Sequence, residues 1–233
     1  ILKSKSECKK TLISIFINPT QFNSKKDLKR YPRNIKKDLS ILKKLKVDYV
    51  FIPKVKVIYK FKRTRKIKLN KTDLILCAKF RKGHFEGVLD VMDRLTNLIK
   101  PKKIFMGKKD FQQLFLVKNY IEKKYKIKVI GCDTIRNKNK LALSSRNFLF
   151  NKDDLDIAEK ISKTFFLVKK KIKINKNIDK YLLETKRNMQ KIFNIKIQYL
   201  ELRDTKNLMI SKKSTKSKIF VSYYLKGIRL IDN

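Results

Sequence analysis

The segment KIFMGKKDFQQLF, residues 103–115, decides the fold because a short apolar run leads through a glycine turn into a helical pattern. We expect a strand over Lys103–Met106 and a helix over Asp110–Lys124. In an open parallel sheet, ligands bind beyond the carboxyl ends of the strands, where helix N-termini direct free N–H groups at anions. The turn is therefore a candidate phosphate-binding site.

Short apolar runs alternate with amphipathic segments in the first 135 residues, which is typical of a parallel sheet flanked by helices. Further strands are expected at Thr11–Ile17, Tyr49–Ile52, Leu74–Ala78 and Ile127–Ile130, a short one within Lys54–Lys71, and helices at Asn34–Leu45 and Phe85–Ile99. The Thr11–Ile17 run is too short for a signal peptide and has no small-residue cleavage site. We therefore expect it to be a buried strand.

The pattern changes after Thr134. Two long helices, at about Lys152–Lys171 and Asn177–Ile192, precede three β-rich runs at Lys196–Leu202, Lys218–Tyr224 and Ile228–Ile231. Helices followed by strands indicate a separate α+β domain. We expect one domain over residues 1–135 and a second over residues 136–233.

The net charge of +42 on 233 residues is the most unusual feature of the composition. It suggests nucleic acid or an acidic membrane surface as a partner. The lysines are scattered through every segment, however, and Gly and Pro number only 5 and 4. AT-rich codon usage accounts for this composition better than selection for nucleic-acid binding. The three cysteines, Cys8, Cys77 and Cys132, form no disulfide or zinc pattern, so a reducing cytosol is expected.

Two further segments carry chemistry: LALSSRN at residues 141–147 and FINPTQF at residues 16–22. Two hydroxyls followed by a guanidinium in the first segment form a compact anion-binding group. With residues 107–113, these segments resemble the pantoate–β-alanine ligase family, which condenses pantoate with β-alanine using ATP. The resemblance extends from Ile13 to Asn233. It implies an α/β fold with a Rossmann-like parallel sheet of the HIGH-motif nucleotidyltransferase type and a smaller α+β C-terminal lid domain.

The resemblance also implies roles for individual residues. The ATP-binding residues would be Gly107, Lys108, Lys109, Asp110, Ile135, Leu143, Ser144, Ser145 and Arg146. Of these, Lys109, Ser144, Ser145 and Arg146 would be catalytic, because they would stabilise charge developing on the phosphates. Gln21 and Gln113 would hold pantoate, and Gln21 would also contact β-alanine. Magnesium would accompany ATP, and no metal site made of protein ligands is expected.

Two positions depart from the family pattern. Lys108 stands where the family motif Gly-Glu-Lys-Asp has a glutamate, and Lys82 replaces the proline of Pro-Gly-His-Phe. The His84 of that segment is the only histidine in the chain, and we expect it to be structural rather than a catalytic base.

The implied reaction forms pantoyl adenylate and pyrophosphate, and β-alanine then displaces AMP to give pantothenate for coenzyme A biosynthesis. The resemblance implies a cytoplasmic homodimer with small-molecule substrates and no membrane partner. The His-x-Gly-His motif of the family would lie just before Ile1, so we expect the sequence to be N-terminally incomplete. The alternatives are a non-catalytic remnant of such an enzyme and, last, a basic RNA-binding relative with its lysines on one face.

Overall fold

The computed structural model describes residues 1–62, 67–175 and 177–233. They form two compact units, and each is described by itself. Unit 1 comprises residues 1–107 and 113–132, and unit 2 comprises residues 108–112 and 133–233. No helix in the described ranges is long and apolar enough to cross a membrane.

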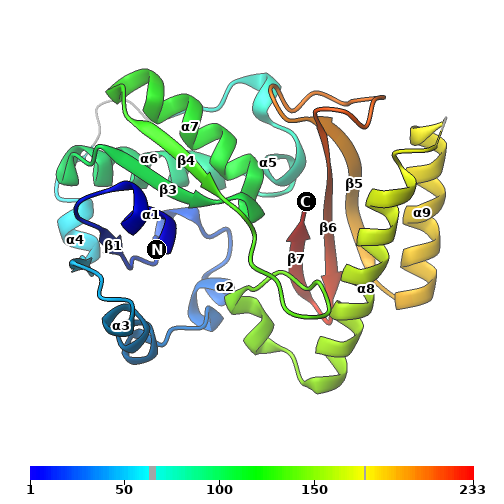
Figure 1. Ribbon diagram of the computed structural model, residues 1–233, viewed down its shortest axis with the longest axis horizontal. Coiled ribbons are helices and arrows are strands. Elements are labelled where there is room, and N and C mark those ends of the chain that lie inside the picture. The colour runs from blue at the N-terminus through cyan, green and yellow to red at the C-terminus, as the bar shows by residue number, and fades with distance from the viewer. Residues whose placement is uncertain (63–66, 176) are drawn as a thin grey trace. The chain divides into compact units, whose positions relative to one another are not determined.

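Unit 1 contains two separate parallel sheets of two strands each (Figure 1). Strand β1 (Leu12–Ser14) pairs with β2 (Tyr49–Phe51), and β3 (Lys103–Gly107) pairs with β4 (Lys128–Cys132). Its helical elements are α1 (Leu2–Glu7), η1 (Pro19–Gln21), α2 (Lys25–Arg30), α3 (Ile35–Lys44), α4 (Val55–Ile58), η2 (Lys71–Asp73), α5 (Leu76–Phe80), α6 (His84–Ile99) and most of α7 (Phe111–Tyr125). The parallel pairing confirms the α/β class, although the strands do not form one continuous sheet.

Unit 2 is built on a three-stranded antiparallel sheet in the order β5-β6-β7. Its elements are η3 (Lys108–Asp110), η4 (Ser145–Leu149), α8 (Lys152–Lys171), α9 (Ile178–Phe193), β5 (Lys196–Asp204), β6 (Ser217–Leu225) and β7 (Ile228–Asp232). Helix α8 contacts β6, and α9 contacts both α8 and β5. One buried apolar cluster joins the two helices to the sheet, with Ile161, Phe165 and Val221 at most 1% exposed. This shared core accounts for the periodic apolar pattern of the helices and strands in unit 2.

Two expectations about unit 1 were wrong. The run at 74–78 is not a strand: its last three residues begin a helix, α5, which Leu76 enters with a φ of 48°. The strand at 11–17 exists only over Leu12–Ser14, and it is not buried, since Leu12 is 39% exposed. The described part of 54–71 contains α4 and the start of η2 but no strand. Residues 63–66 lie outside the described residues, so the short strand expected within this segment stays a prediction.

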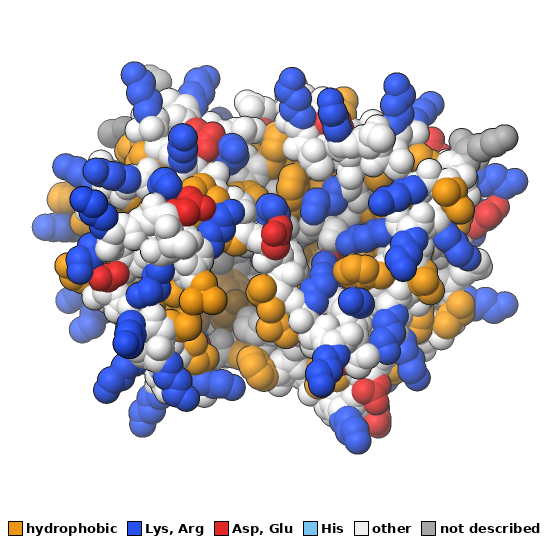
Figure 2. Space-filling model, viewed as in Figure 1, with side chains coloured by type: hydrophobic (Ala, Val, Ile, Leu, Met, Phe, Trp, Pro, Cys, Tyr) orange, Lys and Arg blue, Asp and Glu red, His pale blue; other side chains and the backbone are white. Residues whose placement is uncertain are grey.

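On the face drawn in Figure 2, the basic side chains are dispersed rather than gathered, with other side chains between them. A nucleic-acid site on this face would need a continuous basic patch or stripe, and the view shows none there.

Candidate functional site

Gly107 ends β3, and the three residues of η3 follow it directly. Lys108 Nζ lies 2.6 Å from Asp133 Oδ1, but the Asp133 side chain is 87% exposed, so the pair contributes little stability. The lysine in the family's glutamate position therefore has an acidic partner of its own. The carbonyls of Lys108 and Lys109 both accept hydrogen bonds from Asn233 Nδ2, at 2.9 and 2.6 Å.

Ile135 and Leu143 lie opposite each other on a short hairpin. Leu143 N donates to Ile135 O at 3.0 Å, and Arg136 and Ala142 form an antiparallel bridge one step further in. The two large apolar side chains are 68% and 56% exposed. The structure thus brings together two residues that are eight positions apart in the sequence, and leaves both available to a ligand.

The hydroxyl–hydroxyl–guanidinium segment follows this hairpin directly. Ser144 caps η4, because its Oγ accepts a hydrogen bond from Arg146 N at 3.3 Å. Ser144, Ser145 and Arg146 are all partly exposed. The Ser-Ser-Arg sequence therefore forms a tight turn, which places its three side chains within one short stretch of surface.

Strand β7 connects the two candidate nucleotide-binding segments of unit 2. It contacts η3, which carries Lys109, and η4, which follows Ser144. Residues some 35 positions apart in the sequence are therefore held against one strand. Sequence reasoning missed this role of β7, because a long-range contact of this kind leaves no local pattern.

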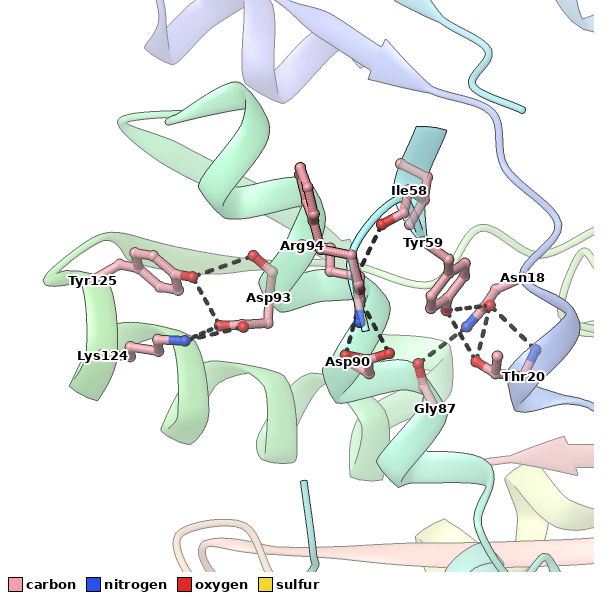
Figure 3. A network of polar contacts seen from close by, with 11 residues as sticks. Asn18, Thr20, Ile58, Tyr59, Gly87, Asp90, Asp93, Arg94, Lys124 and Tyr125 are labelled. Atoms are coloured by element: carbon pink, nitrogen blue, oxygen red, sulfur yellow. Dashed lines mark hydrogen bonds and ion pairs between the residues drawn. The ribbon is translucent and has the colours of Figure 1, made fainter. Parts of the chain in front are cut away.

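Gln21, in unit 1, is the last residue of η1, the first element after β1. Asn18 holds this turn through contacts drawn in Figure 3. Asn18 is 1% exposed, and its Oδ1 accepts hydrogen bonds from Thr20 N at 3.2 Å and from Tyr59 Oη at 2.7 Å. Burial raises the pKa of Tyr59, which keeps the phenol protonated as a donor. Asn18 Nδ2 in turn donates to Gly87 O at 3.0 Å.

Gly87 permits this contact between η1 and α6. A Cβ at position 87 would lie 2.6 Å from the carbonyl oxygen of Thr20, which is closer than real side chains allow. The glycine near the start of α6 is therefore required by the approach of the Gln21 turn, and not by backbone conformation.

His84 also holds the Gln21 turn. Its Nδ1 lies 2.7 Å from Gln21 O, which can only accept, and its Nε2 lies 2.8 Å from Arg81 Nη1, which can only donate. These partners require the neutral tautomer with hydrogen on Nδ1. With both nitrogens engaged and the residue 6% exposed, the expectation of a structural histidine is confirmed.

A second polar cluster on α6 includes residues that the sequence did not single out. Asp93, 4% exposed, accepts hydrogen bonds from Lys124 Nζ and Tyr125 Oη, both at 2.8 Å (Figure 3). Burial opposes the charge on Lys124, but the hydrogen bond and charge of Asp93 raise its pKa overall. These contacts join α6 to the end of α7, the helix that carries the partly exposed Gln113 near its start.

No cluster of three or more potential metal ligands occurs among the residues that the structure describes. Magnesium in nucleotide sites is held largely by phosphates and water, with one or two carboxylates. Asp110, exposed at the end of η3, is a carboxylate suited to that limited role.

Comparison with known proteins identifies the family of this chain. The family model described as pantoate-beta-alanine ligase matches residues 1–233, the whole chain. The chain belongs to the pantoate-beta-alanine ligase family. It is 37% identical to the pantothenate synthetase of Leptospira biflexa, over 99% of this chain and 83% of that protein. It is also 42% identical, over 84% of its length, to part of a bifunctional pantoate ligase/cytidylate kinase of Prochlorococcus marinus.

Solved structures of pantoate-beta-alanine ligases share the fold. Pantothenate synthetase from Thermus thermophilus superposes with a TM-score of 0.91 at 25% identity, covering 99% of this chain and 84% of that one. The ligase from Francisella tularensis, complexed with beta-gamma ATP and beta-alanine, gives a TM-score of 0.80 at 31% identity, with 99% and 81% covered. The expected fold class, a parallel-sheet α/β unit with a small C-terminal antiparallel unit, is confirmed.

Proposed function

We propose that this protein condenses pantoate with β-alanine at the expense of ATP, through a pantoyl-adenylate intermediate, and releases AMP and pyrophosphate. The observation that carries the proposal is the contact of β7 with both η3 and η4 in unit 2. It supports a shared nucleotide-binding role for Lys109 and for the Ser144–Arg146 segment. The family membership of the whole chain supports the choice of substrates.

In the first step, a pantoate carboxylate oxygen attacks the α-phosphorus of ATP, and the bond to the β-phosphate oxygen breaks. Negative charge moves onto the departing pyrophosphate. Lys109 and Arg146 supply positive charge there, and the hydroxyls of Ser144 and Ser145 supply hydrogen-bond donors. Gly107, Lys108, Asp110, Ile135 and Leu143 complete the proposed ATP contacts. Catalysis of this kind works by positioning and electrostatic stabilisation rather than by a protein nucleophile.

In the second step, the β-alanine amine attacks the acyl carbon, loses a proton and expels AMP. Gln21 and Gln113 are assigned to pantoate, and Gln21 also to β-alanine. A neutral amide can orient a carboxylate and hydroxyls by donating and accepting hydrogen bonds. A cation bound to the same carboxylate would reduce its nucleophilicity. The Francisella relative was solved with beta-gamma ATP and beta-alanine, and we extend both kinds of ligand to this chain.

Magnesium is assigned to the nucleotide rather than to a protein site. When bound, it would neutralise phosphate charge, and Asp110 would hold one of its water molecules. A homodimer in the cytoplasm stays a prediction of the family resemblance.

The experiment uses the full-length protein with pantoate, β-alanine and Mg-ATP. The proposal expects pantothenate, AMP and pyrophosphate in equal amounts, with no pantothenate when any one substrate is omitted. Formation of ADP and phosphate instead would contradict the adenylate route. Binding of ATP without any pantothenate would favour the non-catalytic remnant, whereas tight and steeply salt-dependent RNA binding without ATP binding would favour the RNA-binding relative.

A further inference from the structure

The side-chain amide of Asn233 has an orientation fixed by its surroundings. Asn233 is 6% exposed, and its Nδ2 donates to the carbonyls of both Lys108 and Lys109. Turning the amide over would place Oδ1 against two carbonyl oxygens, which cannot donate. In its present orientation, Oδ1 is buried and accepts no hydrogen bond within the described part of the chain. The side chain is therefore oriented so that its NH₂ group makes two hydrogen bonds while its oxygen makes none.

Asp232, directly before it, holds the other candidate nucleotide segment. Arg136 Nη1 and Nη2 lie 2.6 Å from Asp232 Oδ2 and Oδ1, a fork-to-fork pair with side chains only 16% and 8% exposed. Arg136 follows Ile135 in the hairpin whose other arm ends at Leu143 and Ser144. Because both side chains are largely buried and form two hydrogen bonds, this salt bridge holds the base of the hairpin more firmly than a surface ion pair would.

The backbone of Asn233 is held as well as its side chain. Its N–H donates to Asp232 Oδ1 at 2.6 Å, and its carbonyl accepts from Lys169 Nζ, also at 2.6 Å. Lys169 lies on α8, with its Nζ 4.6 Å from the ring centres of Phe165 and Phe166. The pair Asp232–Asn233 is thus anchored to the helical core of unit 2.

We propose that Asp232 and Asn233 are positioning residues for nucleotide binding, which hold the Lys108–Lys109 turn and the Ile135–Leu143 hairpin at a fixed separation. The proposal rests on the proposed function. A trans peptide directs its C=O and its N–H to opposite sides. Because Asn233 fixes the carbonyls of Lys108 and Lys109, it turns the N–H groups of Lys109 and Asp110 the other way. Two N–H groups so aligned are suited to a phosphate oxygen.

The test measures ATP affinity by calorimetry, and KM for ATP and for pantoate, in the full-length protein. Asn233→Asp keeps the shape but replaces the two donors with a charged acceptor, so ATP affinity should fall about tenfold or more. Asn233→Ala should have a smaller effect in the same direction. Arg136→Lys keeps the charge but loses the fork, and should also weaken ATP binding. KM for pantoate should stay within about twofold in all three.

Asn177→Ala is the matched control. Asn177 caps α9 in the same unit, with Oδ1 accepting from Lys180 N at 3.1 Å, and it has no part in the turn. It should lower the unfolding temperature without changing ATP affinity.

Unchanged ATP affinity in Asn233→Asp and Arg136→Lys, in a protein that still makes pantothenate, would overturn this inference and leave the proposed function intact. Equal losses of ATP affinity and of pantoate use, with the same losses in Asn177→Ala, would show that Asp232 and Asn233 have only a structural role. That result would also overturn this inference. A wild-type protein that neither binds ATP nor makes pantothenate would overturn both.

Discussion

Units 1 and 2 are stabilised by different kinds of contact. Unit 2 packs two long helices on an antiparallel sheet around one apolar cluster, and its strands have buried residues on both faces. Unit 1 has two small parallel sheets, and Leu12, Tyr49 and Val50 in the first are 37–57% exposed. Parallel strands are normally buried on both faces. From this difference we infer that the Gln21 turn of unit 1 depends on specific polar contacts. The candidate nucleotide-binding segments of unit 2 are instead supported by a hydrophobic core.

Lys109→Met tests the chemistry assigned to unit 2 and should have the largest effect. Removing a cation that stabilises transition-state charge should reduce kcat by about 10²–10³-fold. The structure of unit 2 should be unchanged, because Asn233 holds the carbonyl of residue 109 and not its side chain. Steady-state kinetics and thermal unfolding check both statements. A kcat within about threefold of wild type would remove Lys109 from the catalytic residues.

Gly87→Ala should break the polar contacts of unit 1. The added Cβ would meet the backbone of Thr20, separate Asn18 from residue 87 and displace the Gln21 turn. We expect a loss of about 2–3 kcal/mol in unfolding free energy, measured by urea denaturation, and a raised KM for pantoate. Gly107→Ala is the control for stability, since a Cβ there meets nothing within 4 Å. Equal stability of the two variants would show that the close approach at Gly87 is unimportant.

Gln113→Ala separates the two substrates. Loss of the amide that is assigned to pantoate should raise the KM for pantoate about 30-fold, corresponding to about 2 kcal/mol, and leave ATP affinity unchanged. Lys118→Ala, at an exposed position further along α7, is the matched control and should behave like wild type. Equal losses for ATP and pantoate in Gln113→Ala would contradict the assignment.

Lys169→Met should have the smallest effect, and it tests the scaffold of unit 2 through pH. Burial lowers the pKa of Lys169 to about 8, with Arg136 and Lys218 adding to the effect and Asp232 opposing it. Between about pH 8 and pH 10 the unfolded chain keeps a proton that the folded chain releases, so stability should rise with pH.

The free energy of unfolding should rise by about 1–2 kcal/mol between pH 7.5 and pH 9.5, and this rise should be smaller in Lys169→Met. The lowered pKa of Lys218 contributes a slope of the same sign, which stays in the variant. Lys170→Met, an exposed neighbour on α8, should keep the wild-type slope. Urea denaturation across this pH range makes the measurement, and identical slopes in all three proteins would show that Lys169 is not the group responsible.

Local pattern was sufficient for much of the fold. Helix α8 occupies Lys152–Lys171 as expected, with Asn151 accepting from Asp154 N as a regular N-cap. The strand predicted at Leu74–Ala78 overlaps the first three residues of α5, because a short apolar run has no period long enough to distinguish a strand from a helix. Strand β1 was expected to be buried because the run at Thr11–Ile17 is apolar, but apolarity alone does not say what covers a strand.

The sequence predicted the candidate site residues but not the residues that hold them in position. Motif resemblance indicated Lys109, Gln113, Ile135, Leu143 and the Ser144–Arg146 segment, but it did not indicate that Ile135 and Leu143 lie opposite each other on a hairpin. The roles of Asp232 and Asn233 depend on contacts across 96 to 125 positions, which a single sequence does not reveal.

Isotope transfer tests the central claim most directly. Pantoate labelled with ¹⁸O in its carboxylate should give AMP that carries one ¹⁸O atom per turnover, because the carboxylate oxygen that attacks the α-phosphorus stays with AMP when β-alanine displaces it. Unlabelled AMP, or the appearance of ADP as the nucleotide product, would contradict the adenylate route proposed for this protein.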